Sequence, residues 1–179
     1  MSMIDTLRAL VGADAVLDAT DVATRSAGVM RQDKLQAAAL VRPKTNEEVS
    51  AVMRWCHANG VPVVTHGGLT GLVHGSDADA NSVILSLERM RTIEDINPRE
   101  RTATVQAGVV LQALQEAVDP HELAFPLDLG ARGSATLGGN AATNAGGNRV
   151  IRYGMMRDMV LGLEVVLADG TVVSSMNRL

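Results

Sequence analysis

A stretch of low side-chain bulk between Phe125 and Tyr153 constrains this chain more than any other feature. It reads FPLDLGARGSATLGGNAATNAGGNRVIRY and combines glycines with short hydroxyl and amide side chains. Glycine lets the backbone approach a ligand closely and adopt positive φ, and the short polar groups add hydrogen bonds of short reach. Such a segment is typical of a chain that grips a large, flat, polar-edged molecule. The alternative is a plain surface loop, but long loops without a function are uncommon.

A second glycine-rich stretch, HGGLTGLVHGS, runs from His66 to Ser76 and follows the apolar run from Val61 to Val64. The apolar run predicts a buried strand. A glycine-rich turn at the end of a strand can direct consecutive N–H groups at one anion. Neither common phosphate motif is present, because no Lys-Ser or Lys-Thr follows the glycines and the G-x-G-x-x-G spacing is absent.

The two stretches carry a resemblance to a known family. The runs RPKTNEEVSAVMRWCHANGVPVV, HGGLTGL and PLDLGARGSATLGGNAATNAGGNRVIRYGMMRDMVLGLEVVLADG resemble the FAD-linked oxidases of the p-cresol methylhydroxylase and vanillyl-alcohol oxidase type. Within that family the chain looks most like the D-lactate, glycolate and 2-hydroxyglutarate dehydrogenases. The resemblance covers roughly Ala37 to Ser174. It implies an α+β fold with a small β-α-β lobe, a second, mainly antiparallel lobe, and FAD held between two facing glycine segments.

The resemblance also divides the chain. Residues 1–36 are expected to form a helical lead and residues 37–179 the FAD-binding domain, with lobe one at about 37–90 and lobe two at about 91–179. Members of the family are much longer, so we expect an amino-terminal part that is incomplete at the C-terminus. A complete small domain is the alternative.

The family's FAD contacts map onto this sequence residue by residue. The first stretch matches the loop around the FAD pyrophosphate, and His66 stands where related loops often carry arginine. The second matches the family's other FAD segment, with Leu127 and Leu129 departing from its Pro-Pro-Asp-Pro element. The residues that the resemblance assigns to FAD are His66, Gly67, Gly68, Leu69, Thr70, Gly71, Leu72, Pro126, Asp128, Ser134, Thr136, Gly138, Gly139, Thr143, Asn144, Gly146, Gly147, Tyr153, Gly154 and Val165.

The resemblance implies oxidation of a 2-hydroxy acid of D configuration by hydride transfer to FAD, with an unknown electron acceptor. Some members tether the flavin to a histidine just after the paired glycines. Here Leu69 and Thr70 occupy that place, so we predict non-covalent FAD. The catalytic groups are expected beyond Leu179, and none is assigned. Two alternatives stay open: an NADPH- and FAD-dependent peptidoglycan-precursor reductase, and a non-catalytic nucleotide-binding or interaction domain.

Local patterns predict most of the elements. Helices are expected over residues 2–11, from Thr45 to Gly60, over about 109–118 and over 136–144, the last with its amino end facing the ligand. Strands are expected at 37–41, 61–65, 82–87, 91–97, 101–107, 159–168 and 171–175. The strands on either side of the Thr45 helix should be parallel. Residues 13–35 predict an irregular lead.

Composition limits the class of protein. A net charge of −4 without a basic stripe argues against nucleic acid as a partner. The lone Cys56 excludes an intrachain disulfide, and no His or Cys cluster has metal-ligand spacing. The N-terminus is too short and charged for a signal peptide or a membrane span. We therefore expect a cytoplasmic protein without a metal or an indicated membrane association. Because only three residues are aromatic, its core must be aliphatic.

Overall fold

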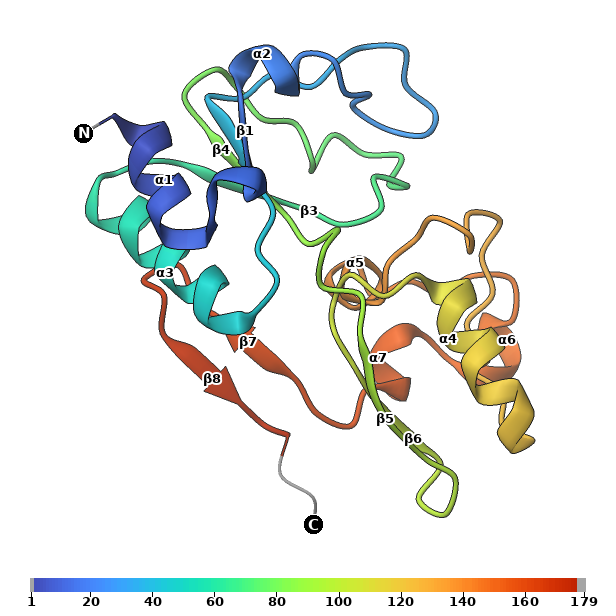
Figure 1. Ribbon diagram of the computed structural model, residues 1–179. Coiled ribbons are helices and arrows are strands. Elements are labelled where there is room, and N and C mark those ends of the chain that lie inside the picture. Colours follow the sequence, from blue (N-terminus) through green and yellow to red (C-terminus); the bar gives the residue numbers. More distant parts are fainter. Residues whose placement is uncertain (1, 177–179) are drawn as a thin grey trace. The chain divides into compact units, whose positions relative to one another are not determined.

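In the computed structural model, which describes residues 2–176, a four-stranded sheet carries the first of two units (Figure 1). This unit contains the chain up to Arg89 and again from Gly162 onward. The strand order is β1 (Val16–Asp18), β2 (Ala39–Val41), β4 (Val83–Ser86) and β3 (Val63–His66). β2 and β3 both run parallel to β4, which lies between them, and β1 pairs antiparallel at the edge. The predicted parallel arrangement of β2 and β3 is confirmed.

Helix α3 (Asn46–Ala58) connects β2 to β3, and both of its ends follow from sequence. Thr45 accepts a hydrogen bond from the Glu48 N–H, as a capping residue should. The Glu48 carboxylate does not return to Thr45; it accepts from the N–H of Lys44, one residue earlier. At the other end Gly60 adopts φ +65°. The Val61 N–H then donates to the Cys56 carbonyl, which closes a Schellman motif.

The lead before β2 is more ordered than predicted. Helix α1 (Met3–Val11) begins with a capping box between Ser2 and Asp5 and packs against α3. A short 3₁₀ turn, η1 (Ala13–Ala15), strand β1 and helix α2 (Ala19–Val22) follow. The missed strand, β1, has only a weak pattern of its own and is stabilised by pairing with β2.

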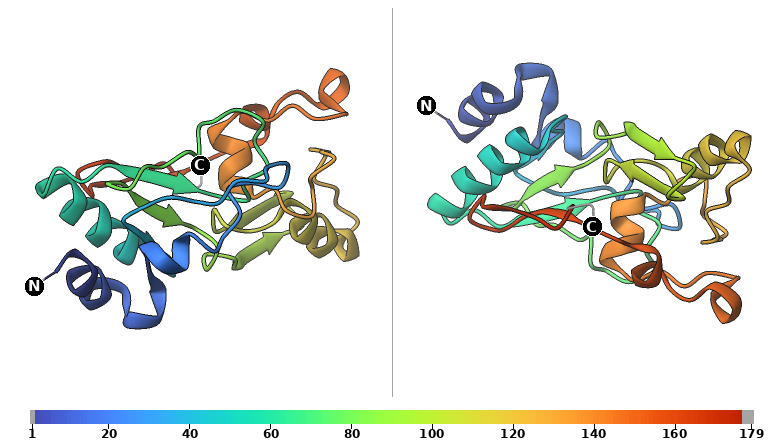
Figure 2. Two further views of the ribbon diagram at one scale, coloured as in Figure 1. Left: turned by 90° about the horizontal axis from the view of Figure 1, so that it is seen from above. Right: turned by 90° about the horizontal axis from the view of Figure 1, so that it is seen from below.

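The hairpin of β7 (Glu164–Val166) and β8 (Val172–Ser174) belongs to the first unit, although the sequence-based division placed it in the second lobe. Its turn lies against α3, where the Ser50 hydroxyl donates to the Gly170 carbonyl (Figure 2). A Cβ at Gly170 would be 2.6 Å from the Ser50 carbonyl, so only glycine permits this contact. The strand predicted at 159–168 is shorter in the structure, because residues Met156–Met159 form helix α7.

The second unit, Met90–Leu161, contains the antiparallel pair β5 (Ile93–Asn97) and β6 (Thr102–Val105). Helix α4 (Leu111–Val118) and the 3₁₀ turn η2 (Asp119–His121) follow, then α5 (Leu137–Ala142), α6 (Val150–Tyr153) and α7. The predicted hairpin and the helices at α4 and α5 are confirmed, and α6 and α7 were not predicted.

Each unit has its own aliphatic core, as the scarcity of aromatic residues predicts. In the first unit Val22, Leu40 and Ile84 are buried together, with Ala27 and Leu35 from the chain between α2 and β2. In the second unit the buried cluster joins α4, α5 and α7; its members are Val109, Leu111, Leu114, Val118, Leu127, Leu137 and Met156. Burial of such side chains contributes on the order of 1.5–3 kcal/mol each.

Candidate functional site

The glycine loop, defined here as residues 67–76, leaves the carboxyl end of β3 with its hydrogen-bond donors unused. Within the part of the chain that the structure describes, none of its backbone N–H groups donates to a protein acceptor. Residues 67–70 are nevertheless half-buried. Backbone donors shielded from water almost always have partners, so the unused donors of the half-buried residues 67–70 suit an acceptor supplied from outside the chain. Ligands in α/β sheets bind outside the carboxyl ends of parallel strands, where this loop lies.

Leu69 holds the loop in an unusual backbone conformation. Its φ is +53°, in the left-handed region that non-glycine residues rarely adopt. Its carbonyl accepts a hydrogen bond of 3.2 Å from the Val29 N–H, and Val29 belongs to the chain before β2. A conformation costing about 1–2 kcal/mol persists only where its surroundings enforce it, and such residues gather at binding sites.

His66 closes the loop rather than lining it. The ring is buried, with 2% of its surface exposed, and its Nε2 lies 2.8 Å from the Ser76 carbonyl at the far end of the loop. Burial lowers the pKa of His66 below its ordinary value, so the ring is neutral near pH 7 and Nε2 carries the proton that it donates. The sequence predicted a direct contact of His66 with the cofactor. Its side chain is already occupied by Ser76, so its expected role is to hold the loop's shape.

Two glycines of the loop have no intramolecular reason to be glycine. A Cβ at Gly71 or Gly75 would meet no heavy atom within 4 Å among the described residues, and neither has a φ in the left-handed region. Packing and backbone strain therefore do not explain them. Open space of this kind would let a ligand approach the backbone donors closely, because no Cβ stands in the way.

The second segment, residues 125–154, uses its backbone differently. Residues 135–138 pair with 107–111: the Leu111 N–H donates to the Ala135 carbonyl, and the Gly138 N–H donates to the Ala107 carbonyl at 2.8 Å. A Cβ at Gly138 would be 2.7 Å from the Ala107 Cβ, so this glycine serves packing. The Leu137 N–H is also in use, and the Gly139 N–H approaches the Thr136 hydroxyl. The donors at the amino end of α5 are therefore in use within the chain, and the expectation that this end faces a ligand stays a prediction.

Free donors in the second segment lie further on. The N–H groups of Gly146 and Gly147 have no acceptor within the described chain. Gly147 has φ +69°, and a Cβ there would be 2.2 Å from the Asp128 carbonyl oxygen. That same oxygen accepts from the Asn148 N–H at 2.7 Å. This contact brings the predicted residues Asp128, Gly146 and Gly147 together.

Asn140 is a candidate that the sequence-based reasoning did not assign. It lies in α5 with 5% of its surface exposed, and its Nδ2 is buried without a hydrogen-bond partner among residues 2–176. A buried donor left unsatisfied costs roughly 1–3 kcal/mol, so such groups require an explanation. There was little reason in the sequence to single out Asn140, because Thr143 and Asn144 nearby are also short polar residues. Only its burial distinguishes Asn140 from them.

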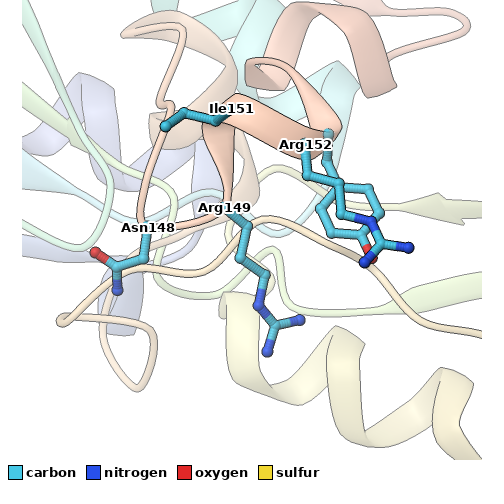
Figure 3. A pocket seen from close by; sticks show the side chains of 5 residues that line it. Asn148, Arg149, Ile151 and Arg152 are labelled. Carbon is cyan, nitrogen blue, oxygen red and sulfur yellow. The ribbon is translucent and has the colours of Figure 1, made fainter.

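A hollow of about 410 Å³ lies beside α6 and is lined by Asn148, Arg149, Ile151, Arg152 and Tyr153. Figure 3 shows Asn148 and Arg149 extending in the same direction, away from Ile151. The Arg152 guanidinium lies 5.2 Å from the centre of the Tyr153 ring, a cation–π contact. Arg149 Nε is 3.8 Å from the Asp128 carboxylate. Two arginines make the hollow cationic. Tyr153 is the one lining residue that the sequence analysis assigned to FAD.

The other predicted positions are spread along their units. Gly154, with φ +78°, ends α6, and the Asn144 Oδ1 accepts from the Arg157 N–H. Val165 is exposed on β7 in the first unit. Half-buried positions are Pro126, Asp128, Gly138, Gly139, Asn144, Gly146, Gly147 and Gly154; Thr136 is buried; exposed positions are Gly71, Leu72, Ser134, Thr143 and Tyr153.

Residues 2–176 present neither a metal-binding cluster nor a membrane-spanning helix. No cluster of His, Cys, Asp and Glu there could hold a metal ion. None of the helices in this range has the length and apolar character that crossing a bilayer requires. Burial raises the pKa of the Cys56 thiol to about 11, which makes it a poor nucleophile near neutral pH.

Comparison with known proteins places these segments in a class. Residues 37–175 match the FAD binding domain family. Among solved structures, p-cresol methylhydroxylase with bound substrate aligns over 96% of this chain and 34% of its own, with a TM-score of 0.75 and 25% identity. The fold is thus that of a p-cresol methylhydroxylase-type FAD-binding domain, as the sequence predicted. The chain belongs to the FAD binding domain family, and its cofactor is FAD.

Curated relatives with similar sequences are named as one kind of enzyme. D-2-hydroxyglutarate dehydrogenase of Xanthomonas citri pv. viticola is 48% identical over 141 residues, which are 79% of this chain and 30% of that protein. The mitochondrial D-2-hydroxyglutarate dehydrogenase of Bos taurus is 47% identical over 140 residues, 78% of this chain and 26% of that protein. The chain therefore spans about a quarter to a third of the length of these relatives. Because the cattle relative is named mitochondrial, a cytoplasmic location stays a prediction.

The residues present fit FAD. Its pyrophosphate is an anion that needs several donors, and the glycine loop has a run of unused N–H groups. Its flavin ring carries acceptor atoms, which suit a buried donor without a partner such as Asn140 Nδ2. The open space over Gly71 permits a close approach of the pyrophosphate to the glycine loop.

Proposed function

We propose that this chain is the FAD-binding part of a flavin-dependent oxidoreductase that oxidises a D-2-hydroxy acid of the 2-hydroxyglutarate class. The unused N–H groups of the glycine loop carry the FAD part of this proposal. The names of relatives that are 47% and 48% identical support the substrate class. When bound, FAD supplies the two-electron acceptor for a hydride.

The chain's own residues bind and orient the cofactor. Backbone N–H groups of Gly67 to Leu72 donate to the pyrophosphate, in a loop that His66 closes through Ser76. In the second unit the N–H groups of Gly146 and Gly147 and the Asn140 amide supply further donors. The predicted contacts of Pro126, Ser134, Thr136, Thr143, Tyr153, Gly154 and Val165 remain part of the proposal.

We infer that FAD is bound without a covalent bond. Tethers to flavin are usually histidine, cysteine or tyrosine side chains, and residues 67–73 contain none of these. The neighbouring His66 is buried against Ser76, and the His74 ring pairs with the Asp77 carboxylate at 2.8 Å. Denaturation of the loaded protein should therefore release all of the FAD into the supernatant. Flavin that stays with the precipitated protein would contradict this inference.

Titration of FAD with the purified chain, followed by quenching of flavin fluorescence, tests the cofactor. Saturable quenching is the expected result, and its absence would overturn the cofactor assignment for this chain. The substrate is tested without oxygen on the whole protein, because the catalytic groups are expected beyond Leu179: D-2-hydroxyglutarate should bleach the visible flavin bands, and the L enantiomer should not. D-lactate, glycolate and NADPH complete the comparison. Bleaching by NADPH alone would favour the reductase over the hydroxy-acid enzyme, and binding without bleaching by any of them would remove the substrate proposal while leaving FAD binding.

A further inference from the structure

A segment outside the family match lies against the glycine loop. Residues 25–35, which we call the arm, precede residue 37, where the match to the FAD binding domain family begins. In Figure 1 the arm is the blue loop after α2, next to the green loop after β3. The Leu35 N–H donates to the Arg25 carbonyl and the Ala27 N–H to the Asp33 carbonyl, so the arm closes on itself.

The base of the arm is firmly anchored in the first unit. Ala27 and Leu35 are buried in the core cluster with Leu40 and Ile84. The Arg25 guanidinium donates to both oxygens of the Glu88 carboxylate, and Glu88 follows β4. Two-point pairing of this kind fixes orientation as well as charge. The arm is therefore a fixed support, against which a neighbouring loop can be held.

The arm contacts the middle of the glycine loop through its backbone. The Val29 N–H donates to the Leu69 carbonyl, on the residue with the left-handed φ. Gly28 approaches the same carbonyl, since a Cβ there would be 3.3 Å from the Leu69 oxygen. This contact helps to enforce the strained conformation, which turns the adjoining N–H groups away from protein acceptors.

Arg31 joins the arm to the end of the loop. Its Nε donates to the Asp33 carboxylate at 2.8 Å, and its NH1 donates to the carboxylate of Asp77, the residue after the loop. The guanidinium therefore bridges the two carboxylates. The hydrogen bond from Arg31 keeps the pKa of Asp77 below its usual value, with a smaller contribution from His74, so Asp77 is ionised near pH 7.

We propose that Arg31 is a positioning residue for flavin binding, which latches the arm to Asp77 and holds the glycine loop in the conformation that exposes its donors. The proposal rests on the proposed function, because the loop's ligand is taken to be FAD. Arg31 does not itself contact the cofactor in this scheme. Its effect is to reduce the number of conformations that FAD binding must otherwise select, which raises affinity.

The test compares Arg31→Gln and Asp77→Asn with a matched control. Asp14→Asn removes the 3.1 Å ion pair with Arg89, which lies in the same unit and does not involve the loop or the arm. FAD affinity is measured by fluorescence titration and stability by urea unfolding. Each latch variant should raise the Kd for FAD roughly three- to fivefold, as expected for an exposed ion-pair network. Their stability loss should match that of the control, whose Kd stays within about twofold of the wild type.

Two further variants separate positioning from a general structural role. The double variant R31Q/D77N should bind FAD no more weakly than either single variant, because each single substitution already removes the same interaction, the Arg31–Asp77 ion pair. Arg31→Lys should recover only part of the affinity, since an ammonium is a point charge that cannot bridge two carboxylates as guanidinium does. Additive losses in the double variant, or wild-type affinity in R31Q, would overturn the proposal.

A measurement without FAD keeps this inference distinct from the proposed function. Backbone ¹⁵N relaxation of the FAD-free protein should show greater mobility of residues 67–73 in R31Q than in the wild type or in D14N. Should the wild type fail to bind FAD, the proposed function falls and the latch is judged by this result alone. Equal loop mobility in R31Q and the wild type would refute the latch itself.

Discussion

The glycine loop and the second segment have similar compositions and opposite backbone arrangements. In the loop the N–H groups are unused, and Gly71 and Gly75 have open space where a Cβ would be. In the second segment residues 135–138 are paired with 107–111, and Gly138 and Gly147 lie against backbone. The open glycines of the first region support the proposal that they serve a ligand, whereas in the second region glycine mainly serves packing. Composition identifies both as special, but only hydrogen-bond partners distinguish the two reasons.

The largest effect is expected where glycine serves packing. Gly147→Ala places a Cβ 2.2 Å from the Asp128 carbonyl oxygen at a φ of +69°. Strain and overpacking together should lower the free energy of unfolding by about 3 kcal/mol or more. Urea unfolding of the FAD-free protein measures this loss. A variant as stable as the wild type would mean that Gly147 is not held against Asp128.

The loop should respond in the opposite way. Gly71→Ala should leave the free energy of unfolding within about 0.5 kcal/mol of the wild type, because the added Cβ meets nothing. Its Kd for FAD should rise tenfold or more, since loss of hydrogen bonds to a charged group costs about 1.5–3 kcal/mol. Gly130→Ala is the matched control, because Gly130 is equally open and carries no predicted FAD contact. Equal FAD affinities of G71A, G130A and the wild type would remove the ligand explanation for Gly71.

Asn140 tests whether the second segment also has a group that awaits a ligand. Asn140→Leu removes a buried donor without a partner and keeps a similar volume, so the FAD-free protein should be equally or more stable. Its Kd for FAD should rise about threefold to tenfold if Nδ2 donates to the cofactor. Fluorescence titration and urea unfolding on the same preparations provide the two values. Unchanged affinity would leave the second segment with packing as the reason for this residue.

The smallest effect concerns pH. The pKa of His66 is lower in the folded protein than its ordinary value of 6.5, so the unfolded chain binds the proton first as pH falls. The stability that neutral His66 contributes is present above about pH 6.5 and declines as pH falls from there through the folded-state pKa. His66→Gln keeps a donor for the Ser76 carbonyl but cannot titrate, so its stability should vary less with pH in that window. Identical slopes in both proteins would show that the loop's closure does not depend on this ring.

Much of the first unit could be predicted from local pattern. Thr45, Gly60 and the apolar run before the glycine loop mark the ends of α3 and β3, because capping and chain reversal depend on neighbouring residues. Strand β1 could not be found in this way, since its pairing with β2 supplies most of its stability. The grouping of the hairpin after Gly162 with the first unit could not be predicted from sequence for a related reason. Its turn at Asp169 and Gly170 is local, whereas its contact with Ser50 depends on the whole fold.

In the candidate site, too, some features could be predicted from the sequence and others could not. Sequence identified both glycine segments and, through a family resemblance, the cofactor, because a chain that approaches a large ligand must give up side-chain bulk. It did not foresee that His66 pairs with Ser76 or that the donors at the amino end of α5 are in use, and it did not single out Asn140 or Arg31.

The sequence by itself determined most of the elements and the aliphatic character of the two cores, since these follow from residue type and near-neighbour spacing. The class of cofactor came from the chain's resemblance to a known family. Tertiary structure alone decided which donors remain unused, which glycines have open space, and which arginine braces the loop. Those properties depend on what residues distant in the chain have already satisfied. Pairing of residues 135–138 with residues 107–111 uses N–H donors of the second segment. The arm and His66 instead hold the glycine loop in a conformation that leaves its donors unused.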